Sequence, residues 1–169
     1  MPASIVLIGP PGAGKTSVGK ALAKATTSQF IDTDALIEKD QGKSISEIFV
    51  DQGEVFFREV EERVCLDTLA NVNGIISLGG GAPLSPKVQN ILKESGLHVI
   101  FLDVSLAVAA PRIGFNRDRP LLLNNPRQQW QLLMDKRRPI YEDVATDIVE
   151  VGQLSVSALC EAILAKVSV

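Results

Sequence analysis

The chain has 169 residues, of which 46% are hydrophobic and 22% are charged, a balance typical of one soluble globular domain. This composition excludes a disordered or collagen-like chain, and no apolar run approaches the roughly 18 residues that a membrane-spanning helix requires. The formal net charge of −3 argues against a nucleic-acid-binding protein, which usually carries a basic field.

Apolar, β-branched runs alternate with helical patterns along the whole chain. The runs predicted to be strands are residues 4–8, 30–31, 75–78, 99–102 and 148–151. Because such strands, separated by helices, form a parallel sheet covered on both faces, we predict an α/β fold with a three-layer, doubly wound sheet. The first strand follows without a preceding charged segment, so we expect no secretory signal and a cytoplasmic location.

Several helix starts carry capping or first-turn residues. They are the capping box of Ser44 with Glu47, and the pairs Ser85-Pro86 and Asn125-Pro126, in which a capping side chain precedes proline. Residues 33–69 are predicted to be helical, with breaks at Gly42 and Gly53.

Residues 112–125 show no clean periodicity and carry Arg112, Arg117 and Arg119 against only Asp118. A long irregular segment in a compact domain is usually a functional lid or a disordered loop. We expect a mobile lid here, the alternative being a solvated surface loop whose basic residues carry no function.

The cysteines and the histidine predict no metal or redox chemistry. Cys65 and Cys160 lie far apart in the sequence and match no ligand spacing, so we expect two reduced, buried thiols. His98 is the only histidine, which argues against a structural zinc site, and its place at the start of a strand gives no support for a Ser-His-Asp triad.

The strongest motif is the segment Gly-Pro-Pro-Gly-Ala-Gly-Lys-Thr at residues 9–16, which fits the phosphate-binding pattern G-x-x-x-x-G-K-[ST]. It follows a predicted strand and opens a predicted helix, which is the context that the motif requires. Its glycines let backbone N–H groups approach phosphate oxygens, and the helix N-terminus adds a partial positive charge. We expect Lys15 to reach the β- and γ-phosphates and the Thr16 hydroxyl to lie on Mg²⁺.

Two carboxylates follow the second predicted strand, at Asp32 and Asp34. They therefore lie at the carboxyl edge of the predicted sheet, which is where α/β sheets bind ligands. Asp32 is a candidate ligand of Mg²⁺, and Asp34 could orient or deprotonate an attacking hydroxyl. The alternative is that the pair only caps the next helix. The chain lacks the N-K-x-D motif of small GTPases.

At this point the sequence resembles the shikimate kinases over nearly its whole length. The further matching motifs, in chain order, are G-E-V-F-F-R-E-V-E at residues 53–61, G-G-G at residues 79–81, R-P-L-L at residues 119–122 and R-R-P-I-Y at residues 137–141. Together they are specific to this family and fit gluconate, adenylate or nucleoside kinases poorly.

The resemblance implies a P-loop, nucleoside-monophosphate-kinase-like fold that transfers the γ-phosphate of ATP to the 3-hydroxyl of shikimate, on the route to chorismate and aromatic amino acids. It implies one domain over residues 1–169, with a substrate-binding helical segment at 33–61 and the lid at 112–125. Neither nucleic acid nor membrane is an expected partner, and a monomer is expected.

The resemblance also assigns residues. The catalytic residues would be Lys15, Asp34 and Arg119. The nucleotide-binding residues would be Gly12, Ala13, Gly14, Lys15, Thr16, Ser17, Arg112 and Arg119. Shikimate would be held by Asp34, Arg58, Gly79, Gly80, Gly81 and Arg137, and Mg²⁺ by Thr16 and Asp32. Glu61 and Glu62, three and four positions after Arg58, are candidates to fix its rotamer.

Some choices stay open at this level. The R-P-L-L match alone selects Arg119 over Arg117 as the phosphate contact, and Asp34 is either a base or an orienting group. Residues 152–154 could form the other wall of the adenine site, and Trp130 is expected to pack in the core. The competing functions are a P-loop kinase for another small hydroxylated metabolite and a catalytically silent nucleotide-binding homologue.

Overall fold

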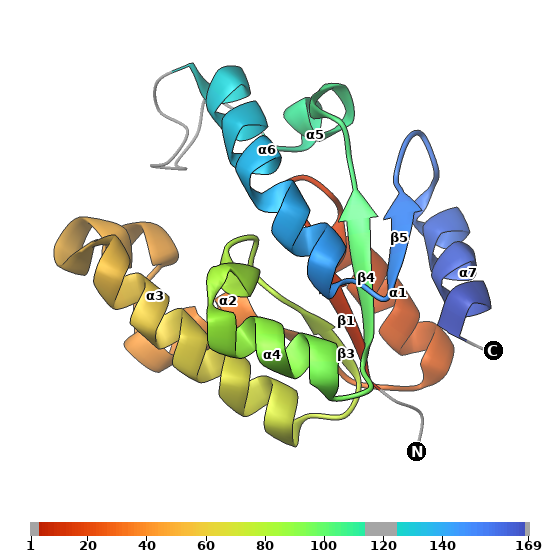
Figure 1. Ribbon diagram of the computed structural model, residues 1–169, viewed down its shortest axis with the longest axis horizontal. Coiled ribbons are helices and arrows are strands. Elements are labelled where there is room, and N and C mark those ends of the chain that lie inside the picture. Colours follow the sequence, from red (N-terminus) through yellow and green to blue (C-terminus); the bar gives the residue numbers. More distant parts are fainter. Residues whose placement is uncertain (1–3, 114–124, 168–169) are drawn as a thin grey trace.

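The computed structural model of the chain describes residues 4–113 and 125–167. In this part of the chain one parallel sheet of five strands, in the order β2-β3-β1-β4-β5, organises the fold (Figure 1). The strands are β1 (Ile5–Ile8), β2 (Phe30–Asp32), β3 (Ile75–Ser77), β4 (His98–Asp103) and β5 (Asp147–Glu150). All paired neighbours are parallel, and each predicted strand is confirmed to within one residue at either end.

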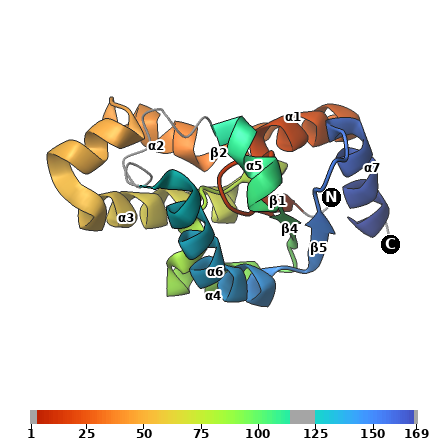
Figure 2. The ribbon, with the colours of Figure 1, turned by 90° about the horizontal axis from the view of Figure 1, so that it is seen from above.

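Helices cover both faces of the sheet, as Figure 2 shows from above. On one face lie α1 (Lys15–Thr26) and α7 (Val156–Val167). On the other lie α3 (Ile45–Asn71), the short 3₁₀ helix η1 (Ala82–Leu84), α4 (Pro86–Glu94) and α6 (Pro126–Val144). The remaining helices, α2 (Thr33–Gln41) and α5 (Leu106–Ile113), pack mainly against α3 and α6 respectively. The predicted three-layer, doubly wound fold is therefore confirmed.

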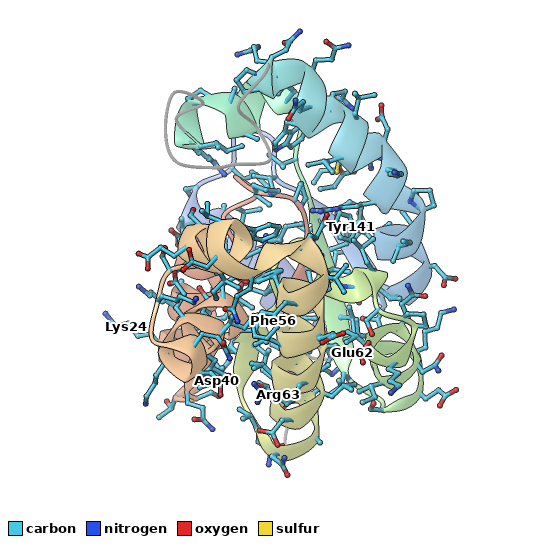
Figure 3. The ribbon with its side chains drawn as sticks, turned by 90° about the vertical axis from the view of Figure 1, so that its left-hand side faces the viewer. Lys24, Asp40, Phe56, Glu62, Arg63 and Tyr141 are labelled. Carbon is cyan, nitrogen blue, oxygen red and sulfur yellow. The ribbon has the colours of Figure 1, made fainter. Side chains whose placement is uncertain are left out.

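A second, smaller apolar cluster lies apart from the main core, between α2 and α3. Its buried members are Ile37, Ile48, Phe57, Val60 and Val64. Arg63 of α3 also donates to Asp40 of α2 at 2.6 Å (Figure 3). This separate core packs α2 and α3 against each other beside the sheet, which holds the side chains that they present to the sheet edge in fixed positions.

The helix caps and helix breaks predicted from the sequence are mostly confirmed. Gly42 ends α2 with φ 70°, and Gly53 breaks α3 with φ 85° and ψ 171°. The Ser44 and Ser85 hydroxyls accept from the backbone N–H groups of Glu47 and Val88. The cap predicted at Asn125 is wrong: this residue has the left-handed φ of 50° and its side chain makes no cap bond. A capping side chain needs extended backbone at the residue before the helix.

The start predicted for the irregular segment is also wrong. Arg112 and Ile113 form the end of α5, which contains Pro111, so the helix continues past the position that the sequence suggested. Residues 114–124, with Arg117 and Arg119, lie outside the described residues.

The predicted state of the thiols is confirmed, since Cys65 and Cys160 are free and buried. Burial raises the pKa of the Cys65 thiol to about 12, which keeps it neutral and unreactive. Across residues 4–113 and 125–167, none of the helices has the length and apolar character needed to cross a membrane.

Candidate active site

The main cavity opens at the carboxyl edge of the sheet, where β1 lies between β3 and β4 and the chain changes direction along the sheet. Ligands of open α/β sheets bind at such switch points. The cavity has a volume of about 620 Å³. It is lined by the loop before α1, the two carboxylates after β2, the end of β3, α5 and the start of α7: Pro11, Gly12, Gly14, Lys15, Thr16, Ser17, Val18, Asp32, Asp34, Ser77, Leu78, Gly80, Arg112, Leu154, Ser155, Val156 and Leu159.

The phosphate loop, residues 9–16, takes a conformation that depends on glycine. Gly12 has φ 84°, and a methyl group there would lie 2.9 Å from the Cβ of Ala109 in α5. Gly14 is the N-cap of α1 with φ 95°. Ala13 differs from the others, because its side chain is fully buried in the main core and only its backbone can contribute to a ligand site.

Lys15 lies at the centre of this loop. Its Nζ donates to the carbonyls of Gly9 at 2.8 Å and Pro10 at 3.1 Å, and it lines the cavity together with Thr16 and Ser17. The ammonium group is thus held where the N-terminus of α1 also presents its partial positive charge. This end of the cavity is suited to polyphosphate.

Asp32 and Asp34 both line the cavity. Asp32 is also the N-cap of α2, since its Oδ1 accepts from the backbone N–H of Asp34 at 2.9 Å. Asp32 therefore both caps α2 and lines the cavity. Thr33, which lies between Asp32 and Asp34 and is buried, donates to the carbonyl of Ser77 at 3.3 Å and accepts from the N–H of Gly79 at 3.1 Å. These two hydrogen bonds connect the start of α2 to the turn that follows β3.

That turn, residues 79–81 (the glycine turn), lies against charged side chains from other elements. A methyl group at Gly79 would lie 2.5 Å from Oδ1 of Asp34, and one at Gly80 would lie 3.3 Å from Nη1 of Arg137. One at Gly81 would overlap the guanidinium of Arg58. The structure thus gathers these predicted residues from α2, α3 and α6 around three positions where an added methyl group would force a neighbouring side chain to shift.

Arg58 is held by acidic side chains of its own helix. Its Nη1 donates to Glu61 at 2.7 Å and its Nη2 to Glu54 at 3.4 Å. Of the two carboxylates expected to fix the rotamer of Arg58, Glu61 is the one that binds it. The Glu62 carboxylate accepts from the Ser85 hydroxyl at 2.6 Å instead. Glu61 is only 4% exposed; burial raises its pKa, and the charge and hydrogen bond of Arg58 oppose that rise.

Arg137 comes from the middle of α6 and is 7% exposed. One turn later, the Tyr141 hydroxyl donates to the carbonyl of Gly80 at 2.6 Å. Burial raises the pKa of Tyr141, with the Arg137 charge opposing, so the phenol stays protonated. Two guanidinium groups, those of Arg58 and Arg137, therefore flank the glycine turn, an arrangement suited to a carboxylate ligand.

A further part of the cavity wall comes from α5 and from the chain that leads into α7. Arg112 Nη1 donates to the carbonyl of Gly12 at 3.2 Å, which places this side chain along the phosphate loop. Leu154, Ser155 and Val156 form a further part of the lining, and both apolar members are partly exposed. Of the predicted residues 152–154, Leu154 lines the cavity while Gly152 and Gln153 do not, and the wall continues with Ser155, Val156 and Leu159, which no sequence motif indicated.

The donors facing the cavity include the hard oxygen atoms that Mg²⁺ prefers. The Thr16 hydroxyl and the Asp32 carboxylate line the same cavity as Lys15, and Mg²⁺ commonly takes only one or two protein oxygens besides phosphate and water. Within residues 4–113 and 125–167, no three His, Cys, Asp or Glu side chains gather into a metal-binding cluster. The Thr16 hydroxyl and the Asp32 carboxylate fit Mg²⁺ that enters with a nucleotide.

The sequence did not indicate several hydrogen bonds that hold the backbone of the phosphate loop and of the glycine turn in place. Trp130 is buried in the core as predicted, but its Nε1 also donates to the carbonyl of Pro11 in the phosphate loop at 3.0 Å. Thr33 and Tyr141 hold the glycine turn in the way described above. Tyr141 lies within the R-R-P-I-Y motif, which is the one signal in the sequence that could have identified it.

Gly79→Ala should weaken binding of the ligand held at the glycine turn at least tenfold and leave nucleotide affinity unchanged. The added methyl group would meet Asp34 at 2.5 Å, and crowding of this kind forces side chains to move at a cost of about 1–3 kcal/mol. Titration of the variant with each ligand separates the effects. The nucleotide titration is the internal control, and equal losses of affinity for both ligands would contradict the prediction.

Comparison with known proteins gives a consistent result. The family model described as shikimate kinase matches residues 11–168. The chain is 49% identical over 142 residues to the shikimate kinase of Rhodococcus erythropolis, covering 83% of each chain. It is 42% identical over 164 residues to that of Rhodococcus jostii, covering 96% of each. Its fold matches a shikimate kinase from Acinetobacter baumannii in complex with shikimate, with a TM-score of 0.93, 34% identity, and coverage of 98% of this chain and 93% of that one.

Proposed function

The chain belongs to the shikimate kinase family, and we propose that it transfers the γ-phosphate of ATP to the 3-hydroxyl of shikimate, giving shikimate 3-phosphate and ADP. The observation that carries the proposal is that one sheet edge holds both a phosphate loop and a glycine turn flanked by Arg58 and Arg137. The first suits a nucleoside triphosphate and the second suits a small carboxylate.

The acceptor is held at the glycine turn. Arg58 and Arg137 bind its carboxylate through charge-assisted hydrogen bonds, with Glu61 fixing the rotamer of Arg58. Asp34, beside Gly79, binds the acceptor hydroxyls and directs one of them toward the phosphate loop. Asp34 acts there either as a base or only by orientation, because a loose transition state requires little early deprotonation.

The donor is held by residues 9–17 and by α5. Backbone N–H groups of the phosphate loop and the Lys15 ammonium bind the phosphates of ATP, and Arg112 lies along the adenine. Thr16 and Asp32 hold Mg²⁺, which neutralises phosphate charge when bound. From the R-P-L-L motif, Arg119 binds the transferring phosphate; this residue lies outside the described part of the chain.

The organisation of the enzyme follows the same proposal. One domain carries both sites, with residues 33–61 as the segment that binds the acceptor and the segment after α5, which lies outside the described residues, as a lid. We infer a monomeric, cytoplasmic enzyme, for which sedimentation velocity of the purified chain and fractionation of cells test each part.

The direct test measures ADP release from MgATP with shikimate, gluconate or a nucleoside monophosphate as the acceptor. We expect turnover with shikimate to exceed that with either alternative by at least 10³-fold, because binding energy from the carboxylate and ring hydroxyls is used for positioning. Comparable turnover with another acceptor would assign the enzyme to that substrate. No turnover with any of them would favour a silent nucleotide-binding protein.

Arg58→Ala and Arg137→Ala should each weaken shikimate affinity far more than ATP affinity. Leaving one side of a carboxylate unpaired in a dry site costs about 2–5 kcal/mol. Isothermal titration with each ligand separates these effects. Arg63→Ala is the matched control, since it removes an exposed guanidinium from α3 that pairs with Asp40. Equal losses of affinity for both ligands in Arg58→Ala and Arg137→Ala would mean that these two arginines serve the nucleotide or the fold.

A further inference from the structure

Helix α6 contacts both ligand-binding loops through buried side chains on successive parts of its length. Trp130, 2% exposed, donates from Nε1 to the carbonyl of Pro11 in the phosphate loop at 3.0 Å. Tyr141, 1% exposed, donates from its hydroxyl to the carbonyl of Gly80 in the glycine turn at 2.6 Å. Figure 3 shows Tyr141 where α6 passes above the α3 side of the molecule.

We propose that α6 sets the relative position of the two substrates, with Trp130 and Tyr141 as positioning residues that each fix one loop. The nucleotide part of this inference rests only on the phosphate loop. The acceptor part rests on the proposed function, because it assigns shikimate to the glycine turn.

Each hydrogen bond fixes the orientation of a peptide group that borders the cavity. In a trans peptide the carbonyl and the following N–H point in opposite directions, and the described residues contain no cis peptide. With the Pro11 carbonyl directed at Trp130, the N–H of Gly12 points away from α6; with the Gly80 carbonyl directed at Tyr141, the same holds for the N–H of Gly81. The two bonds thus determine which way backbone donors point.

Such a constraint matters because both loops are rich in glycine. Glycine has a wide range of accessible backbone conformations, so the Pro11–Gly12 and Gly80–Gly81 peptide groups are the ones that each α6 bond restrains, while other hydrogen bonds hold the carbonyls of Gly9, Pro10, Gly12, Gly79 and Gly81. A loop that is competent only part of the time binds its ligand with an apparent affinity reduced by that fraction. Loss of one bond should therefore weaken one ligand selectively.

The helix itself is anchored to the sheet, so it can serve as a fixed reference. Arg138 makes a bidentate contact with Asp103 at the carboxyl end of β4, at 2.8 and 2.9 Å. The Tyr141 ring packs against Phe101 of β4 with centroids 5.1 Å apart. Arg137 lies on the same helix between Trp130 and Tyr141, so the helix also carries one of the proposed carboxylate ligands.

Trp130→Phe and Tyr141→Phe test the inference, because each keeps a ring and removes the donor. Titration with MgADP and with shikimate should show that each variant weakens the binding of one ligand and not of the other. In Trp130→Phe the dissociation constant of MgADP should rise about threefold to tenfold, the worth of one net hydrogen bond. That of shikimate should stay within about twofold, as for independent sites. Tyr141→Phe should give the converse pattern.

The control is Met134→Leu, which alters a buried side chain of α6 that donates no hydrogen bond to either loop. It should change the melting temperature without weakening the binding of one ligand more than that of the other. If both aromatic variants weakened both ligands equally, or lowered only the melting temperature, the inference would be overturned. If Trp130→Phe did not fold, benzothienylalanine at position 130, which keeps the bicyclic shape without the N–H, gives the same comparison.

The design separates this inference from the proposed function. If the unaltered chain bound no shikimate, the proposed function would fail, while a selective loss of MgADP affinity in Trp130→Phe would still support the role of α6 toward the phosphate loop. If shikimate bound normally and neither variant showed a selective loss, only the role of α6 would fail.

Discussion

Lys15→Ala should lower kcat/KM for ATP by about 10³-fold, within the range known for removing a preorganised charge from a phosphoryl-transfer site. The Lys15 ammonium faces the cavity at the N-terminus of α1, bound to carbonyls of its own loop. Charge that builds on the transferring phosphate would lose a cationic partner. Steady-state kinetics with shikimate and varied MgATP measure the loss, and circular dichroism checks that the fold is retained.

Lys20→Ala provides the comparison, since this residue is exposed on the same helix and does not line the cavity. Its kinetics should match those of the unaltered chain. A Lys15→Ala variant that retained more than a tenth of the original kcat/KM (a loss under about 1.4 kcal/mol) would show that the phosphate loop holds ATP by backbone donors alone.

Asp34→Asn should lower kcat with shikimate by about 10²- to 10⁴-fold, the contribution expected of a positioned acid–base group, with little change in MgATP affinity. Asparagine has nearly the same shape, so the contact with the glycine turn is kept while the negative charge is lost. Asp34 lies in the cavity and beside Gly79, where it would meet the acceptor rather than the nucleotide. Turnover and a separate MgADP titration measure the two effects.

Asp40→Asn is the matched control on the same helix, because Asp40 pairs with Arg63 and does not line the cavity. It should leave turnover unchanged. Near-normal turnover in Asp34→Asn would mean that the acceptor hydroxyl lies elsewhere and that Asp34 mainly supports the glycine turn.

The sequence determined the fold class and the positions of the key motifs. Strand–helix alternation fixes a parallel sheet, and all its carboxyl ends then lie at one edge, so Lys15 after β1 and Asp34 after β2 had to share that edge. Local signals such as Gly53 and the Ser44 cap also worked, because a positive φ or a capping bond depends on neighbouring residues only. The family motifs added Arg58 and Arg137, which no local pattern would have placed together.

Only the tertiary structure decided which side chains support the site. Whether Arg58 pairs with Glu61 or Glu62 depends on which face of α3 is turned toward the glycine turn, and both spacings are allowed on an isolated helix. Trp130 contacts Pro11 across 119 positions of sequence, and Tyr141 contacts Gly80 across 61. Hydrogen bonds of this range arise from how α6 packs on the sheet. Periodicity records that a side chain is buried, but it does not record which distant carbonyl the side chain meets.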